Sequence, residues 1–83
     1  MRFEGKKVVV TGAASGIGEA IALGFAKEGA SVAFMDLNKE IAEKCAFSAK
    51  ETYKTNCIGI GVDVSDKKSV TEALDIVTKL WWN

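Results

Sequence analysis

A short glycine-rich segment is the part of this sequence whose residue types and spacing most directly suggest chemistry. Residues 11–18 read Thr-Gly-Ala-Ala-Ser-Gly-Ile-Gly, between a β-branched run and a helical pattern. Small residues at a helix start leave backbone N–H groups and the positive end of the helix dipole open to an anion. We therefore predict a diphosphate-binding turn made by Gly12, Ser15, Gly16, Ile17 and Gly18.

Each residue of this turn has a separate expected role. Gly12 permits a tight turn with unusual dihedral angles. Gly16 removes a side chain that would block the phosphates, and Gly18 lets the helix pack closely on the sheet. Ser15 can offer its hydroxyl group and Ile17 its N–H group. A plain glycine-rich connection is the simpler interpretation, but the strand before it and the helix after it favour a binding site.

An acidic residue, Asp36, follows the second predicted strand, 18 residues beyond Gly18. A carboxylate there can accept hydrogen bonds from both ribose hydroxyls of an adenosine, and it would repel the 2′-phosphate of NADP. We include Leu37 in the predicted site. Neither Ser15 nor Leu37 carries a positive charge that could neutralise that phosphate, although Lys39 is nearby. The pattern favours NAD. The alternative role for Asp36 is to cap the next turn.

A second acid, Asp63, ends the third predicted strand and is followed by Val64. A carboxylate at this position can accept a hydrogen bond from the exocyclic amine of adenine while Val64 packs on the ring. Taken alone, Asp63 is typical of a turn or cap residue. Its place on the same edge of the sheet as Asp36 and the glycine turn favours contact with adenine.

The elements that must position these residues alternate along the chain. Apolar runs predict three strands, over residues 7–11, 31–35 and 58–62. Helical patterns follow each strand; the first ends at Gly29, the second begins at Asn38, and the third begins at Ser65 or Asp66. This order predicts an α/β fold of the Rossmann type, βαβαβα, with a three-stranded parallel sheet in the order 3-2-1. Such a unit is half of a doubly wound fold.

Apolar stripes on the predicted helices indicate which faces meet the sheet. On the first helix the stripe is Ile17, Ile21 and Phe25, with Ala20 and Gly24 beside it. On the second helix it is Ile41, Ala42, Cys45, Ala46, Ala49 and Tyr53. On the third helix it is Val70, Ala73, Leu74, Val77 and Leu80. We expect these stripes to be buried.

In combination, the glycine segment, Asp36 and Asp63-Val64 resemble the cofactor half of the short-chain dehydrogenase/reductase family. The resemblance covers about Phe3 to about Leu80. It implies a Rossmann fold, NAD as cofactor, Asp36 on the adenosine ribose and Asp63 near adenine. Family members are about three times as long. We therefore expect residues 1–83 to be a single, truncated NAD-binding domain of an oxidoreductase that transfers hydride between NAD and an alcohol or carbonyl substrate.

The catalytic residues that the resemblance implies are absent from these 83 residues. Family members supply a serine and a Tyr-x-x-x-Lys pair. In this chain the residue four positions after Tyr53 is Cys57, and the neighbouring lysine, Lys54, follows Tyr53 directly. The chain has no histidine, which excludes common zinc sites and serine–histidine catalysis. We predict no catalytic or metal-binding residue here, and no hydride transfer by this chain alone.

Charge and composition restrict the partners. Eleven basic residues balance eleven acidic ones, which argues against a nucleic-acid partner, and no apolar run is long enough for a membrane. Cys45 and Cys57 are expected to be buried or half-buried thiols, and we expect a cytoplasmic location. A first strand without a further neighbour would favour self-association, or pairing with a complementary C-terminal fragment.

Two other functional classes stay open from the sequence. The chain could be a nucleotide-binding module without catalysis, such as a sensor or a partner of a complete enzyme. It could also belong to S-adenosylmethionine-dependent transferases, which share a glycine turn and an acid after the second strand. The Gly-x-x-x-Gly-x-Gly spacing, and Thr11 in place of an acid, disfavour the transferase.

Overall fold

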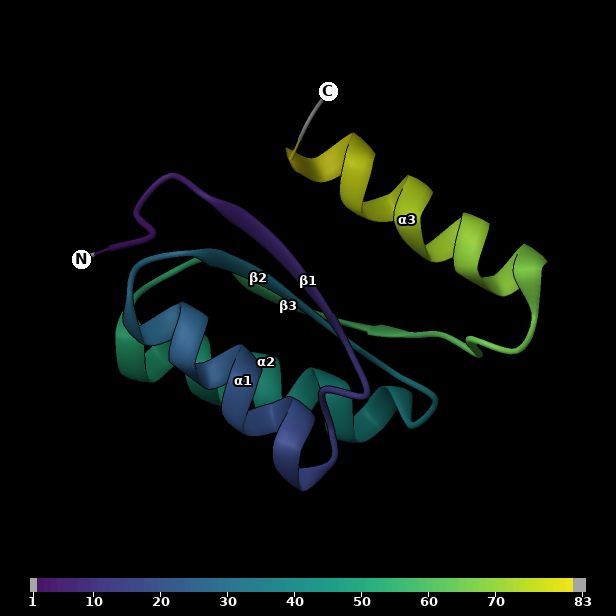
Figure 1. The fold of residues 1–83 in the computed structure, drawn as a ribbon, viewed down its shortest axis with the longest axis horizontal. Helices are drawn as coiled ribbons and strands as arrows, with labels where there is room; N and C mark the ends of the chain where they lie inside the picture. Colours follow the sequence, from purple (N-terminus) through teal and green to yellow (C-terminus); the bar gives the residue numbers. More distant parts are fainter. Residues whose placement is uncertain (1, 82–83) are drawn as a thin grey trace.

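A computed structural model of the chain describes residues 2–81; Met1, Trp82 and Asn83 lie outside the described part. Strands and helices alternate as predicted (Figure 1). The elements are β1 (Lys7–Thr11), α1 (Gly16–Lys27), β2 (Ser31–Asp36), α2 (Lys39–Tyr53), β3 (Cys57–Gly61) and α3 (Lys67–Trp81).

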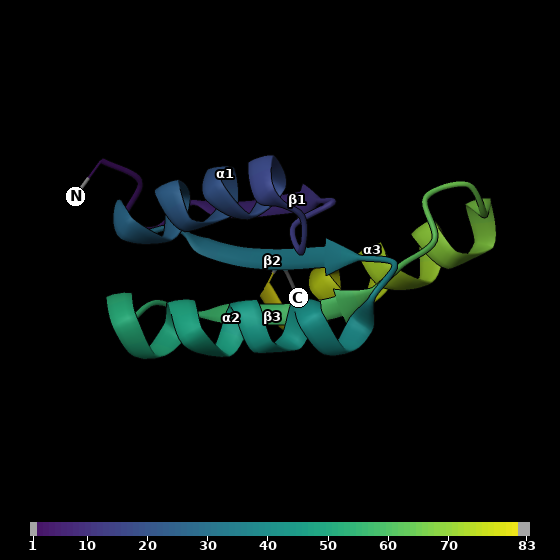
Figure 2. The ribbon, with the colours of Figure 1, turned by 90° about the horizontal axis from the view of Figure 1, so that it is seen from below.

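The three strands form one parallel sheet in the order β1-β2-β3, which confirms the predicted order. Val9 pairs with Ala33, and Ala33 pairs with Ile58. Figures 1 and 2 show α1 and α2 on one face of the sheet and α3 on the other. Because the strands are parallel, the loops that follow β1, β2 and β3 meet at one edge of the sheet.

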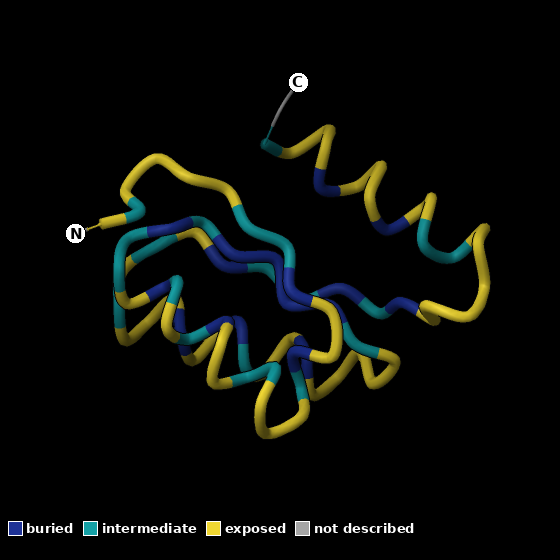
Figure 3. The backbone as a smooth tube through the Cα atoms, viewed as in Figure 1, coloured by how far each residue is buried: buried dark blue, intermediate teal, exposed yellow. Residues whose placement is uncertain are grey.

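The central strand β2 is buried on both faces, as Figure 3 shows for the middle of the sheet. Val32 and Phe34 belong to the core under α1 and α2, whereas Ala33 and Met35 belong to the core under α3. A strand covered on both sides needs apolar residues at every position. This requirement explains why β2 lacks the polar alternation of a half-exposed strand.

The buried face of α1 differs from the prediction. Ala22 and Ala26 are fully buried, whereas Ile17 is 80% and Ile21 is 50% exposed. Residues four positions apart share a helix face, so Gly18, Ala22 and Ala26 form the inner stripe. At its start the helix lies so close to the turn that a Cβ atom on Gly18 would overlap the backbone of Gly12. Ile17 and Ile21 therefore point outward, and the predicted stripe was wrong apart from the half-buried Phe25; Leu23, which the stripe did not include, is also half-buried against the core.

The stripes on α2 and α3 were correct only in part. On α2 the buried residues are Ala42, Ala46 and Ala49, with Cys45 and Tyr53 half-buried against them and Ile41 exposed. On α3 the buried residues are Ala73 and Val77, with Val70 half-buried and Leu74 and Leu80 exposed. The buried members of the stripe on α2 are all alanine, whereas those on α3 include Val77, one of the largest fully buried side chains.

Glycine permits the close contact between α2 and β3. A Cβ atom on Gly59 would overlap the backbone of Ala42 and Glu43. The helix backbone therefore lies directly on the strand at this point. Alanine at 42, 46 and 49 continues the same close packing along the helix.

The ends of the helices follow the predicted capping residues. Gly29, just after α1, has φ +94°. The Asn38 side chain accepts a hydrogen bond from the N–H of Ile41 at 3.1 Å. Of the two candidates at the start of α3, Asp66 is the cap, because its carboxylate accepts from the N–H of Lys68 at 3.0 Å.

Strand β1 is an edge strand of this three-stranded sheet. Its middle residues Val8 and Val9 are half-buried. The expected association through this edge stays a prediction. In residues 2–81, no helix has the length and apolar character needed to cross a membrane.

Candidate functional site

The turn between β1 and α1 presents an open helix start. Gly12 has φ +69°, the left-handed conformation that glycine adopts easily, as predicted. Ser15 is the N-cap residue of α1, but its side chain makes no capping hydrogen bond. Its hydroxyl donates instead to the carbonyl of Gly12 at 2.8 Å. Among the hydrogen bonds of residues 2–81, none uses the backbone N–H groups of residues 16–18.

The two glycines of the helix start differ in their surroundings. A Cβ atom on Gly16 would meet no atom within 4 Å, so the space in front of it is open. A Cβ atom on Gly18 would overlap the carbonyl oxygen of Gly12. The close approach at Gly18 is thus to the turn, and not to the sheet as predicted. Gly16 borders the space where an anion would lie, and Gly18 maintains the shape of the turn.

The carboxylate of Asp36 joins the glycine turn to the start of α2. Its Oδ2 accepts from the N–H of Ala14 at 3.0 Å, and its Oδ1 accepts from the N–H of Asn38 at 3.0 Å. The alternative role as a cap of the following turn is therefore present. The side chain is also held beside the glycine turn, and each carboxylate oxygen can accept more than one hydrogen bond. Binding to a ribose is compatible with both contacts.

The loops after the three strands are tied together at the carboxyl edge of the sheet. The N–H of Ala13 donates to the carbonyl of Met35 at 3.0 Å, and the N–H of Val62 donates to the carbonyl of Asp36 at 2.9 Å. Three exposed apolar side chains lie at this edge, one in the first turn of α1 and one in each of the loops after β2 and β3. These are Ile17, 80% exposed, Leu37, 76% exposed, and Val64, 66% exposed. Exposed apolar side chains at the edge where Rossmann folds bind their ligands are consistent with a surface for a flat aromatic ring.

Asp63 forms a small hydrogen-bonded turn of its own. Its Oδ1 accepts from both the hydroxyl and the N–H of Ser65, at 2.6 and 3.0 Å. These bonds hold the pKa of the Asp63 carboxyl below its usual range. The N–H of Asp63 donates to the hydroxyl of Ser69 at 2.9 Å. Asp63 therefore acts as a turn residue, the alternative that the sequence also allowed, and its contact with adenine stays a prediction.

A carboxylate that the sequence analysis did not single out lies between α1 and α2. Glu19, in the first turn of α1, accepts a hydrogen bond from the Sγ of Cys45 in α2 at 3.2 Å. Burial, then the bond to Glu19 and the charges of Glu19 and Asp36, raise the pKa of Cys45 to about 11. The pair is 26 residues apart, and no local pattern in the sequence indicates it. This thiol is a poor nucleophile at neutral pH.

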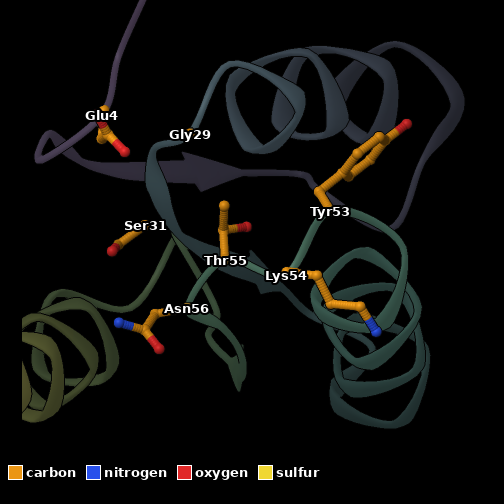
Figure 4. Close-up of a pocket in the computed structure, with 7 residues that line it drawn as sticks. All are labelled: Glu4, Gly29, Ser31, Tyr53, Lys54, Thr55 and Asn56. Atoms are coloured by element: carbon orange, nitrogen blue, oxygen red, sulfur yellow. The ribbon is translucent and has the colours of Figure 1, made fainter. Parts of the chain in front are cut away.

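The residues that could suggest a catalytic pair lie elsewhere. A polar hollow of about 300 Å³ is lined by Glu4, Gly29, Ser31, Tyr53, Lys54, Thr55 and Asn56, at the amino ends of β2 and β3 (Figure 4). The side chains of Tyr53 and Lys54 point in different directions there. Tyr53 packs against the core under α1 and α2, as predicted. Within residues 2–81, no group of three or more metal-ligating side chains comes together.

Comparison with known proteins agrees with this architecture. The family model described as short chain dehydrogenase matches residues 6–82. The chain belongs to the short-chain dehydrogenase family. It corresponds to the N-terminal segment of these oxidoreductases, which use nicotinamide dinucleotide cofactors.

Individual members of the family match nearly the whole chain. A meso-2,3-butanediol dehydrogenase of Serratia marcescens is 40% identical over 79 residues, which are 95% of this chain and 30% of the relative. A D-threitol dehydrogenase of Mycolicibacterium smegmatis is 46% identical over 76 residues, 92% of this chain and 29% of the relative. The crystal structure of a hydroxysteroid dehydrogenase from Escherichia coli superposes with a TM-score of 0.93 at 27% identity, over 99% of this chain and 34% of that chain. The chain thus spans about a third of the length of these relatives.

Proposed function

We propose that this chain is the NAD-binding segment of a short-chain dehydrogenase that transfers hydride between NAD and an alcohol or carbonyl substrate. The observation that carries the proposal is the open start of α1 beside the carboxylate of Asp36. Relatives named for the dehydrogenation of butanediol and threitol support an alcohol as the substrate class. Bound NAD would supply the hydride acceptor.

The residues of the carboxyl edge suit the separate parts of NAD. The free N–H groups of Gly16, Ile17 and Gly18 would donate to the diphosphate, where the helix dipole adds to the attraction. Asp36 would accept from the ribose hydroxyls. The exposed side chains of Leu37 and Val64 would cover the adenine ring, and Asp63 would lie near its amine.

The charge of Asp36 supports NAD rather than NADP as the cofactor. A carboxylate about 4 Å from a 2′-phosphate would raise the free energy of the complex by several kcal/mol before screening. Ser15 and Leu37 provide no compensating cation. The ribose of NAD has hydroxyls that can donate to the carboxylate instead.

Calorimetric titration of the chain with NAD, NADP and S-adenosylmethionine tests the proposal. We expect NAD to bind most tightly. Gly16→Ala should weaken NAD binding by about tenfold or more, because its methyl group enters the space of the diphosphate. Gly24→Ala is the matched control, because it lies in the same helix with open space around it and away from the turn. Tighter binding of NADP or S-adenosylmethionine, or equal affinity of the two variants, would refute the proposal.

A nucleotide-binding module without catalysis is the second candidate, because the open start of α1 and the carboxylate of Asp36 account for nucleotide binding alone. Hydride transfer distinguishes the two. A mixture of this chain with the C-terminal part of a related dehydrogenase would reduce NAD in the presence of an alcohol if the chain is an enzyme segment. NAD binding without any such activity would support the module.

A further inference from the structure

Glu19 is a charged side chain placed at an interface between helices. It is half-buried in the first turn of α1, and its Oε2 accepts from the Sγ of Cys45 in α2 at 3.2 Å. The hydrogen bond directs the carboxylate toward α2. Figures 1 and 2 show α1 and α2 side by side on the same face of the sheet.

Asp36 acts on the same thiol from the end of β2. Both Glu19 and Asp36 lie close enough to Cys45 for their charges to raise its pKa. The Asp36 carboxylate is fixed by the N–H groups of Ala14 and Asn38. The two carboxylates therefore connect the start of α1 to α2 by hydrogen bonds: Asp36 through Ala14 and Asn38, and Glu19 through Cys45.

Among the described residues, neither carboxylate is held in a salt bridge, although Lys39 follows Asp36 closely in the sequence. Within residues 2–81, no ion pair involves Glu19 or Asp36; the recorded pair is Asp75–Lys79 on α3. The field of both negative charges therefore extends into the region beside Asp36. A dinucleotide with a free 2′-hydroxyl adds no charge there, whereas a 2′-phosphate adds about two negative charges.

We propose that Glu19 is a second specificity-determining residue, whose charge acts with Asp36 to exclude dinucleotides that carry a 2′-phosphate. The inference rests on the proposed function, because it concerns the same nucleotide site. It predicts that Asp36 does not determine cofactor choice alone. The hydrogen bond from Cys45 fixes the Glu19 carboxylate against α2, one turn from the open start of α1.

Charge and structure can be separated by three single substitutions. Glu19→Gln removes the charge but keeps an oxygen that can accept from Cys45. Cys45→Ala removes the hydrogen bond but keeps the charge. Glu28→Gln makes the same change of net charge just beyond the far end of α1, where Glu28 accepts from the N–H of Arg2.

Titrations with NAD and NADP, at low salt, give the ratio of their dissociation constants for each protein. We expect Glu19→Gln to shift the ratio toward NADP by about threefold, the size expected for one solvent-screened charge. The shift should shrink when salt is raised to about 0.5 M. Glu28→Gln should leave the ratio unchanged, and Cys45→Ala should change it less than Glu19→Gln.

The outcomes separate this inference from the proposed function. If the unmodified chain does not bind NAD, both fail. If NAD binds but Glu19→Gln leaves the ratio unchanged, Glu19 has no role in selection and only this inference fails. If Cys45→Ala shifts the ratio as much as Glu19→Gln, the spacing of the helices rather than the charge is responsible, and the inference is overturned.

Discussion

Replacing Gly18 with alanine tests how the glycine turn is built. A methyl group at this position would overlap the carbonyl oxygen of Gly12 and lie 3.3 Å from the backbone nitrogen of Ala13. Both neighbours are backbone atoms, so no side-chain rotation can relieve the contact. The Gly12 carbonyl would have to move, and it accepts hydrogen bonds from both the hydroxyl and the N–H of Ser15.

The expected change in stability follows from opposing effects. Alanine in place of glycine stabilises a helix by about 1 kcal/mol. Overpacking costs about 1–3 kcal/mol, and each weakened hydrogen bond about 1 kcal/mol. With both bonds from Ser15 disturbed, we expect Gly18→Ala to lower the free energy of unfolding by about 2–4 kcal/mol. Gly24→Ala, which meets no atom within 4 Å, should raise it by about 0.5–1 kcal/mol.

Urea denaturation of the two variants, followed by circular dichroism, measures the difference. The substitutions are chemically identical and lie in the same helix, so changes in the unfolded chain are matched. Binding of NAD should be lost in Gly18→Ala and retained in Gly24→Ala. A Gly18→Ala chain as stable as the Gly24→Ala chain would refute the claim that this glycine permits the close contact with the turn.

Three other properties can be measured directly. With its pKa raised to about 11, Cys45 should be alkylated about 100-fold more slowly at pH 8 than an ordinary thiol, as followed by mass spectrometry. Because the native chain holds this proton more tightly, that contribution to stability is lost as the pH rises from about 9 to about 11. Ser65→Ala should raise the pKa of Asp63 toward its usual value, measured by carboxyl NMR, whereas Ser69→Ala should leave it unchanged. Because the native pKa is lowered, the stability from Asp63 is lost as the pH falls through the acid range below about 4. Finally, the exposed edge of β1 should make the sedimentation coefficient rise with concentration; a single monomeric species throughout would contradict this.

The order of elements could be predicted because its signals are local. Short apolar runs identify the strands, and Gly29, Asn38 and Asp66 end or begin helices through contacts within a few residues. Parallel pairing then follows from the alternation of strands and helices. The position of the candidate site followed as well, because parallel strands bring Gly16 and Asp36 to one edge.

The buried faces and the contacts between helices could not be predicted in the same way. On α1, both the larger and the smaller residues recur with a helical period, so periodicity alone cannot select between them. The selection is made by how closely the helix approaches the turn, which depends on Gly18 and Gly12 together. The bond between Glu19 and Cys45 depends on the relative positions of two helices, which no local pattern specifies.

Asp36 combines a structural role with its proposed role in binding, and the substitution Asp36→Asn separates them. Both oxygens of the carboxylate accept from backbone N–H groups, those of Ala14 and Asn38. An asparagine has one acceptor oxygen, so one of these N–H groups would face an amide NH₂ group that cannot accept. We expect a loss of about 1–2 kcal/mol in the free energy of unfolding, even without ligand. The control Asp75→Asn removes the same charge from an exposed ion pair on α3 and should change stability by less than about 0.5 kcal/mol. Equal effects of the two substitutions in urea denaturation would show that Asp36 does not tie the turn to α2. A larger effect at Asp36 would mean that any exchange of cofactor preference at this position also loosens the glycine turn.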